Sequence, residues 1–207
     1  MEEKIDVKIK DSVVEILIPA KKIEGKKSKL IPLDIDKDTL MELESIGNTL
    51  KEVCIRKKGA GLSACQIGIF KSMFVWKAKD KWELVINPQT FIKKKSVLAH
   101  EGCLSYPDKV YFIQRCKQVW VKYYIVQNHK LKMKARQLNG YNAIVFQHEY
   151  DHSIGKTLKT EGRLDEERSD LKKKAEKEKK RIEKLKAKKV DVKPKVENTK
   201  VHKIQNR

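Results

Sequence analysis

The stretch Gln147-His148-Glu149-Tyr150-Asp151-His152 closes the last strongly apolar part of the chain. Two histidines four positions apart lie one above the other on a helix, so both imidazoles can reach a single divalent cation. The carboxylate of Glu149 then projects close to the open position of that cation. A cap at Asn139 and a stop at Gly155 favour such a helix. The pattern predicts a metal site with its own base, and the alternative is a polar helix end exposed to water.

A catalytic site of this kind uses three protein ligands and keeps one position for water, so a third ligand is needed. Upstream, the stretch Glu101-Gly102-Cys103-Leu104-Ser105 places a cysteine in a short polar break between two apolar runs. Further upstream, residues 59–68 form a glycine-rich turn, Gly-Ala-Gly-Leu-Ser-Ala-Cys-Gln-Ile-Gly, that leads into an apolar strand. The chain therefore contains three motifs whose order can be compared with known families.

In this order the three stretches resemble the signature motifs of the peptide deformylase family, GxGLAAxQ, EGCLS and HExDH. The second and third motifs match at every position, and in the first Ser63 stands where the family usually has alanine. The match spans roughly residues 33–157, which is most of the predicted folded chain. The L-R-x-x-A-x-P pattern that deformylases commonly carry near the N-terminus is absent, so the resemblance does not predict how the N-terminal arm packs.

The resemblance implies three metal ligands, namely Cys103, His148 and His152. Glu149 would take a proton from the attacking water and later deliver it to the leaving amine. The Gln66 side-chain amide and the Leu104 backbone N–H would donate to the oxygen that gains negative charge. Family members use ferrous iron, with zinc, nickel or cobalt as replacements, and this ligand set accommodates any of the four. One divalent cation, Fe²⁺ by family resemblance, is therefore expected.

The implied substrate is the N-formylmethionyl end of a nascent polypeptide, cleaved to formate and a free amino terminus during N-terminal methionine processing. Gly61 would let the backbone approach a substrate that pairs as an added strand. Ile144 and Val145 would line an apolar pocket for the methionine side chain, although ordinary core packing uses the same residue types. Arg115 falls near a family arginine that helps to position substrate, and a surface salt bridge is the alternative.

Hydrophobic periodicity predicts an α+β fold, with mixed or antiparallel sheets around a central metal-binding helix. An N-terminal amphipathic helix is predicted from a cap at Asp38 to the residues before Gly59. Short strands are predicted at residues 13–18 and repeatedly between residues 73 and 138. The last two strands are predicted to form a hairpin, because residues 127–130 read Gln-Asn-His-Lys between two apolar runs.

The chain changes character after residue 164, where a thin apolar stripe lies among many charges. A long charged helix is predicted to about Lys189, followed by a disordered end. The predicted domains are therefore a deformylase-like catalytic domain, residues 1–164, and a basic C-terminal helix and tail, residues 165–207. The net charge of +20 favours polyanions such as ribosomal RNA, and deformylases are thought to dock on ribosomes through such a helix. A solvated helix and a generally lysine-rich composition are the alternatives.

Four cysteines without close pairing favour a reducing compartment. The N-terminus has no basic flank followed by an apolar region, and the apolar runs are too short to cross a bilayer. We therefore expect a cytoplasmic monomer without a membrane partner.

Two other functions stay open at this point. A zincin-like metallopeptidase would take its third ligand downstream of the second histidine, where Glu161 is the nearby candidate. A non-catalytic ribosome- or RNA-binding protein could use the same fold without turnover. The presence of every expected ligand and of the base argues against this second alternative.

Overall fold

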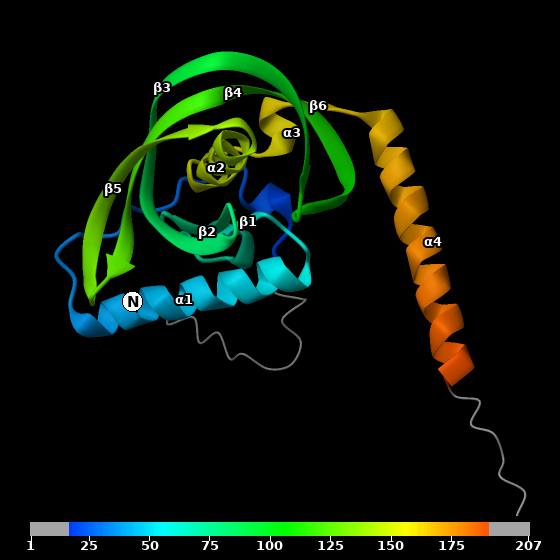
Figure 1. Cartoon of the computed structure of the whole chain (residues 1–207), viewed down its shortest axis with the longest axis horizontal. Coiled ribbons are helices and arrows are strands. Elements are labelled where there is room, and N and C mark those ends of the chain that lie inside the picture. Colours follow the sequence, from blue (N-terminus) through cyan, green and yellow to red (C-terminus); the bar gives the residue numbers. More distant parts are fainter. Residues whose placement is uncertain (1–16, 191–207) are drawn as a thin grey trace, which may run out of the picture.

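A computed structural model of the protein describes residues 17–190 and shows an α+β fold built on a six-stranded antiparallel sheet (Figure 1). In chain order the elements are η2 (Ala20–Lys22), α1 (Lys37–Arg56), β1 (Gly61–Ser63), η3 (Ala64–Ile67), β2 (Met73–Ala78), β3 (Lys81–Cys103), β4 (Tyr106–Gln127), β5 (Lys130–Asn139), α2 (Gly140–Ser153), α3 (Leu158–Glu161), β6 (Arg163–Leu164) and α4 (Glu166–Val190). The sheet curls around α2, and α1 lies on the outside beside β1 and β2. The predicted α+β class and antiparallel pairing are confirmed.

Strand β2 separates two hydrophobic cores because its side chains alternate between the two faces of the sheet. Met73 and Val75 pack with α1, whereas Phe74 and Trp76 pack with α2. Phe146 of α2 meets the rings of Phe74 and Trp76 edge to face, with centroids 5.1 Å and 5.5 Å away. The first turns of α2 are therefore held firmly against the sheet, which fixes the direction in which the rest of the helix points.

Helix α1 begins two residues earlier than the sequence predicted. Its N-cap is Asp36, whose side chain accepts a hydrogen bond from the backbone N–H of Thr39 at 2.7 Å. Asp38 instead lies in the first helical turn. Aspartate is a preferred residue at the N-cap, so the sequence allows either position. The structure places Asp36 at the cap. Cys54, on the inner side of α1, is fully buried in the core.

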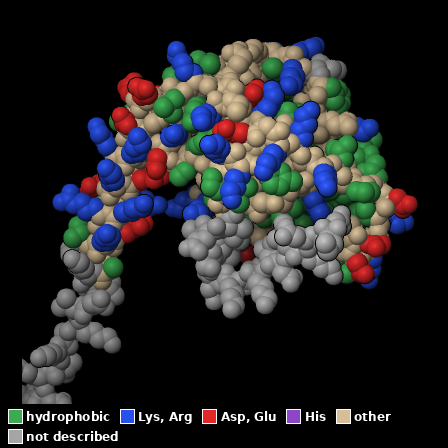
Figure 2. Space-filling view, turned by 180° about the vertical axis from the view of Figure 1, so that it is seen from behind, with side chains coloured by type: hydrophobic (Ala, Val, Ile, Leu, Met, Phe, Trp, Pro, Cys, Tyr) green, Lys and Arg blue, Asp and Glu red, His purple; other side chains and the backbone are tan. Residues whose placement is uncertain are grey.

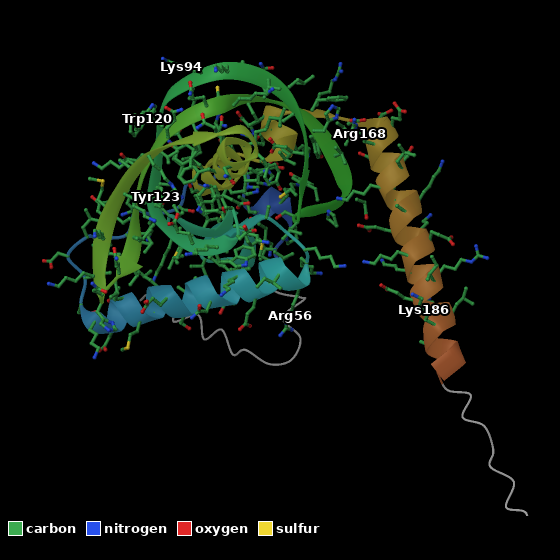
Figure 3. The ribbon with its side chains drawn as sticks, viewed as in Figure 1. Arg56, Lys94, Trp120, Tyr123, Arg168 and Lys186 are labelled. Carbon is green, nitrogen blue, oxygen red and sulfur yellow. The ribbon has the colours of Figure 1, made fainter. Side chains whose placement is uncertain are left out.

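Strands β3 and β4 are much longer than the short strands that the sequence predicted. They pair along almost their whole length. Register shifts near Asn87 and near Lys93 interrupt the regular pairing, but β3 continues as one strand across them. Asn87 has a positive φ of 49°, and its side chain bonds both backbone groups of Ile31. Trp120 and Tyr123 lie on β4 where the sheet curls around α2 (Figure 3). The predicted hairpin is confirmed, because β4 ends at Gln127 and β5 begins at Lys130.

Helix α4 leaves the sheet beside the tips of β3 and β4 and projects away from it (Figure 1). Its length agrees with the predicted long charged helix. Most of the predicted strand at residues 13–18, and the predicted disordered end of the chain after residue 190, lie outside the described residues. The division into domains at residue 164 stays a prediction. No helix among residues 17–190 is long and apolar enough to span a membrane.

Candidate metal centre and active-site cleft

A cleft of about 1100 Å³ opens between β1, the turn joining β3 to β4, α2 and α4. It is lined by eight of the ten residues that the sequence analysis singled out: Gly61, Gln66, Cys103, Leu104, Ile144, Val145, His148 and Glu149. His152 lies directly behind this surface, fully buried on the next turn of α2. Arg115 is the one candidate that the structure places elsewhere. Residues from four separate segments thus meet in one concave site.

Three potential metal ligands come together at the bottom of the cleft. Cys103 ends β3, and His148 and His152 lie on successive turns of α2. One ligand atom from each side chain lies within 4.8 Å of the other two, and the Cys103 Sγ to His152 Nε2 distance is 3.3 Å. A thiolate and two imidazoles at this spacing form a donor set that suits zinc or ferrous iron. The cluster can therefore hold one such cation.

Both histidines are oriented by a hydrogen bond at Nδ1. The Nδ1 of His148 lies 2.8 Å from Glu101 Oε2, and the Nδ1 of His152 lies 3.2 Å from the carbonyl oxygen of Lys156. When Nδ1 donates to these oxygens, the neutral imidazole keeps its lone pair on Nε2. The Nε2 atoms are then free to act as ligands, which is the arrangement found around histidine ligands in metalloproteins.

Cys103 is electrostatically prepared to lose its proton. Burial of the thiol opposes ionisation, but the imidazoles of His152 and His148 outweigh it and hold the pKa of Cys103 well below its usual value. The thiolate is the form of cysteine that binds metals. Cys65, in contrast, packs under His152, and burial raises the pKa of its thiol to about 12. Cys65 therefore remains a packing residue and Cys103 the candidate ligand.

Arg115 forms a buried ion-pair network behind His148. Its guanidinium donates to both carboxylate oxygens of Glu101, at 2.7 Å and 3.0 Å, and also pairs with Asp151. Its side chain is 5% exposed and does not line the cleft. The expected contact of Arg115 with substrate therefore gains no support from its position. The structure instead connects Arg115, through Glu101, to His148, one of the three candidate metal ligands.

Glu149 lies beside the cluster and is almost fully buried, with 3% of its surface exposed. Burial is the main reason that its pKa is raised above the ordinary value for glutamate. The hydroxyl of Ser63 donates to Glu149 Oε2 at 2.8 Å and also lies 2.9 Å from its backbone carbonyl. Gly61 provides the space for this carboxylate, because a Cβ there would lie 2.7 Å from Glu149 Oε1. The carboxylate is thus held in one place by its neighbours.

The side chain of Gln66 is oriented from both ends of its amide. Its Oε1 accepts the backbone N–H of Ser63 at 2.9 Å, which fixes the direction of the Nε2 group. The Nε2 group lies 3.1 Å from Ser105 Oγ and 3.5 Å from Cys103 Sγ. Leu104 lies in the turn between these two residues and also lines the cleft. An amide donor therefore points at the region next to the candidate metal ligands.

The comparison with known protein families agrees with this geometry. The family model described as polypeptide deformylase matches residues 26–168, well over half of the chain. The chain belongs to the peptide deformylase family. The matched segment contains all three motifs and every residue of the cleft discussed above.

Named relatives are bacterial peptide deformylases. The peptide deformylase of Thermotoga maritima is 42% identical over 98 residues, which are 47% of this chain and 58% of that protein. The chain thus aligns with less than two thirds of the length of this relative. The peptide deformylase of Wigglesworthia glossinidia brevipalpis is 33% identical over 149 residues, which cover 70% of this chain and 92% of the relative.

Solved deformylase structures have the same fold. The crystal structure of the Thermotoga maritima peptide deformylase aligns with a TM-score of 0.62 at 31% identity, covering 70% of this chain and 95% of that one. The Plasmodium falciparum peptide deformylase, solved in complex with an inhibitor, aligns with a TM-score of 0.57 at 25% identity, covering 70% and 86%. The likeness therefore extends over most of the two solved chains.

Three side chains at the site of this family member carry contacts that sequence reasoning did not anticipate. They are Ser63, Glu101 and Ser105. Each lies inside a recognised motif, so its position in the sequence was a signal that it lies near the site. Ser63 contacts Glu149, Glu101 contacts His148 and Ser105 contacts Gln66, and each of these pairs is separated by at least 39 residues in the sequence. Such pairings depend on how the segments pack together and not on local pattern.

Proposed function

We propose that the protein is a metal-dependent hydrolase that removes the formyl group from the N-terminal formylmethionine of polypeptides and releases formate. The observation that carries this proposal is the convergence of Cys103, His148 and His152 within 4.8 Å, with the buried Glu149 next to them in an open cleft. Family membership supports the same reaction.

The proposed metal is held by the Cys103 thiolate and by Nε2 of His148 and of His152. When bound, a divalent cation supplies Lewis acidity, which lowers the pKa of a water molecule toward neutrality and polarises the formyl carbonyl. We infer Fe²⁺ from the family resemblance, and the Cys/His/His donor set also suits Zn²⁺, Ni²⁺ or Co²⁺. Metal analysis of protein purified without added metal and without oxygen identifies the native ion.

Glu149 is the proposed proton carrier. Its raised pKa, caused first by burial, makes the carboxylate a better proton acceptor than an exposed glutamate. It takes a proton from the attacking water and later delivers it to the nitrogen that leaves as the free amino terminus. The hydrogen bond from Ser63 holds one carboxylate oxygen, so Oε1, which lies toward Gly61, is left to move the proton.

Gln66 and Leu104 are the proposed donors to the formyl oxygen. This oxygen gains negative charge as the formyl carbon becomes tetrahedral, and donors already fixed in place stabilise it most. The Gln66 amide meets this condition because Ser63 and Ser105 hold its two ends. Loss of one such donor typically lowers kcat by about a hundredfold or more.

The methionine side chain of the substrate is proposed to lie against Ile144 and Val145, which both face the cleft one turn before His148. The remaining peptide would extend past Gly61 and pair with β1 as an added strand. This assignment places the formyl group over the cluster and the polypeptide toward the open end of the cleft.

Measuring formate released from a formyl-Met tripeptide tests the proposal, with protein loaded with Fe²⁺ or Ni²⁺ under reducing conditions. We expect Cys103→Ala to lose both metal and activity, whereas Glu149→Gln keeps the metal and loses activity. Absence of formate with the metal-loaded wild-type protein refutes the reaction. Equal loss of metal in both variants refutes the separate roles of ligand and base.

The other two functions are less well supported. Glu161, the candidate third ligand of a zincin-like peptidase, pairs with Lys156 on the surface, and Cys103 takes the third place in the cluster. A binding protein without turnover would have no need for a fully assembled site.

Docking of the basic helix α4 on ribosomal RNA, by a cytoplasmic monomer, remains a proposal. It rests on the many lysines of this helix, which Figure 2 shows spread along its surface. Co-sedimentation with ribosomes tests it, using a variant with the exposed lysines Lys173 and Lys184 changed to glutamate. Unchanged co-sedimentation at physiological salt would count against docking through α4.

A further inference from the structure

Helix α4 forms one wall of the active-site cleft, which the sequence analysis did not anticipate. Lys172, Glu176 and Lys180 line the cleft and follow one another at four-residue spacing, so they lie on one face of the helix. The side chain of Lys172 is half-buried, and its Nζ lies 3.4 Å from the point where a Cβ on Gly102 would be. Gly102 immediately precedes Cys103. An ammonium group therefore lies beside the backbone of Gly102, within the lining of the cleft.

The start of α4 is anchored to the sheet, so the position of Lys172 is set by the fold. Asp165 accepts the backbone N–H of Arg168 at 3.1 Å and lies 3.0 Å from Nδ1 of His100 on β3. One turn later, Ser169 is buried and its hydroxyl accepts the backbone N–H of Val110 on β4 at 3.0 Å. Lys172 follows Ser169 by less than one turn. The helix therefore delivers its first cleft-facing lysine to a defined place.

The open end of the cleft carries an excess of positive charge. Lys57 and Lys58, just after α1, line the cleft together with Lys172 and Lys180 of α4. Figure 3 shows the two helices concerned, with Arg56 at the end of α1 nearer to α4 and Arg168 near the start of α4. Among the described residues, none of these four lysines forms an ion pair within 4.0 Å.

Among the described residues, three carboxylates line the cleft with these lysines. Glu176 lies between Lys172 and Lys180 on α4 and is the one carboxylate of that helix that lines the cleft. Glu101 is already engaged by Arg115 and His148, and Glu149 lies at the buried end. Of the four lysines, Lys57 and Lys172 are half-buried, whereas Lys58 and Lys180 are exposed. A half-buried cation binds an anion more favourably than a fully exposed one, because water screens it less. The wall that α4 forms is thus suited to an anionic ligand.

We propose that this cleft prefers formylated peptides that carry acidic side chains in the residues directly after the formylmethionine, with Lys172 and Lys180 as the residues that set the preference. The inference rests on the proposed function, because it assumes that the peptide runs from the cluster toward the open end. Eight helical residues span about 12 Å, so the two lysines match three to four residues of an extended peptide. Their ammonium groups would donate charge-assisted hydrogen bonds to the carboxylates.

The test compares two peptides that differ in charge and hardly in shape, formyl-Met-Glu-Ala-Ala-Glu-amide and formyl-Met-Gln-Ala-Ala-Gln-amide, with the full-length metal-loaded protein. The two glutamates are three residues apart, to match the spacing of the two lysines. We expect kcat/KM to be about three- to tenfold higher for the glutamate peptide, as two partly screened ion pairs would give. The double variant Lys172→Glu/Lys180→Glu should remove or reverse this ratio, mainly through KM.

The matched control is Lys174→Glu/Lys177→Glu, which makes the same charge change at exposed positions of α4 that do not line the cleft. This control should keep the wild-type preference, since only the general charge of the protein changes. Equal kcat/KM for the two peptides overturns the proposal, and so does an equal effect of the two double variants.

Binding of the same peptides, labelled with a fluorophore and followed by anisotropy, separates this proposal from the proposed reaction. If no formate is released but the glutamate peptide still binds more tightly in a Lys172-dependent way, the reaction is refuted and the charge preference stands. If formate is released from both peptides at equal efficiency, the reaction stands and the charge preference is refuted.

Discussion

Replacing Glu101 by glutamine tests the buried network behind the candidate metal centre. Burial opposes ionisation of this carboxyl, but hydrogen bonds from His148 and Arg115 outweigh it and lower the pKa of Glu101 from 4.5 to about 2. One pKa unit corresponds to about 1.4 kcal/mol, so the ionised carboxylate contributes roughly 3 kcal/mol to the free energy of unfolding. Because the folded-state pKa is depressed, this contribution is present above the unfolded-state pKa and is lost as the pH falls from 4.5 toward 2.

Urea unfolding of the metal-free protein measures this effect. We expect Glu101→Gln to be less stable than wild type by about 3 kcal/mol at neutral pH, and the difference to shrink as the pH falls below about 4.5. The exposed Glu167→Gln provides the matched control and should behave as wild type. A variant as stable as wild type at neutral pH, or a loss of stability that does not depend on pH, would refute the reasoning.

The same substitution should also weaken metal binding. Glu101 orients the ring of His148, and loss of such a partner typically lowers metal affinity about 10- to 100-fold. Competition with a chromogenic chelator measures the change. Metal affinity equal to that of wild type would show that Glu101 does not support the ligand.

Three further substitutions probe other contacts. Ser63→Ala removes the hydrogen bond to Glu149 and should lower kcat about tenfold with KM and metal content unchanged; an unchanged kcat would contradict the orienting role. Gly61→Ala would place a Cβ 2.7 Å from Glu149 Oε1 and should lower kcat by up to about a hundredfold, whereas metal loss measured by atomic absorption would point to a wider disturbance. Glu83→Gln removes a carboxylate that Tyr123 and Lys134 contact and whose pKa is lowered. Urea unfolding should show that the variant is less stable than wild type by about 1–3 kcal/mol at neutral pH, and the difference in stability should shrink in acid. Equal stability of the two proteins at neutral pH would refute this.

The candidate metal centre could be predicted from the sequence because its core is encoded locally. The spacing of His148 and His152 places both on one side of a helix whatever the rest of the chain does. Glu149 is adjacent to the first of them, so its nearness to the cluster follows from the same local geometry. Only Cys103 required information beyond the helix, and the order of the three motifs supplied it.

The sequence predictions were wrong where contacts between distant segments determine the structure. Separate short strands were predicted between residues 73 and 138, yet the partner strand β4 holds β3 together across Asn87, where φ is positive, and across the register shift near Lys93. Arg115 was expected at the substrate because its place in the sequence resembles that of a family arginine. Its actual partners, Glu101 and Asp151, lie 14 and 36 residues away, and their charges draw the guanidinium into the interior.

The sequence by itself determined the helix that carries two potential ligands and a base, the long charged helix near the C-terminus, and the likeness to one family. Each of these depends on spacing along the chain or on the order of motifs. Only the tertiary structure decided that Ser63 holds Glu149, that Arg115 supports His148 through Glu101, and that Lys172 faces the cleft. The reason is physical: contacts between residues far apart in sequence depend on how α2, α4 and the sheet pack, and chain spacing does not specify that packing.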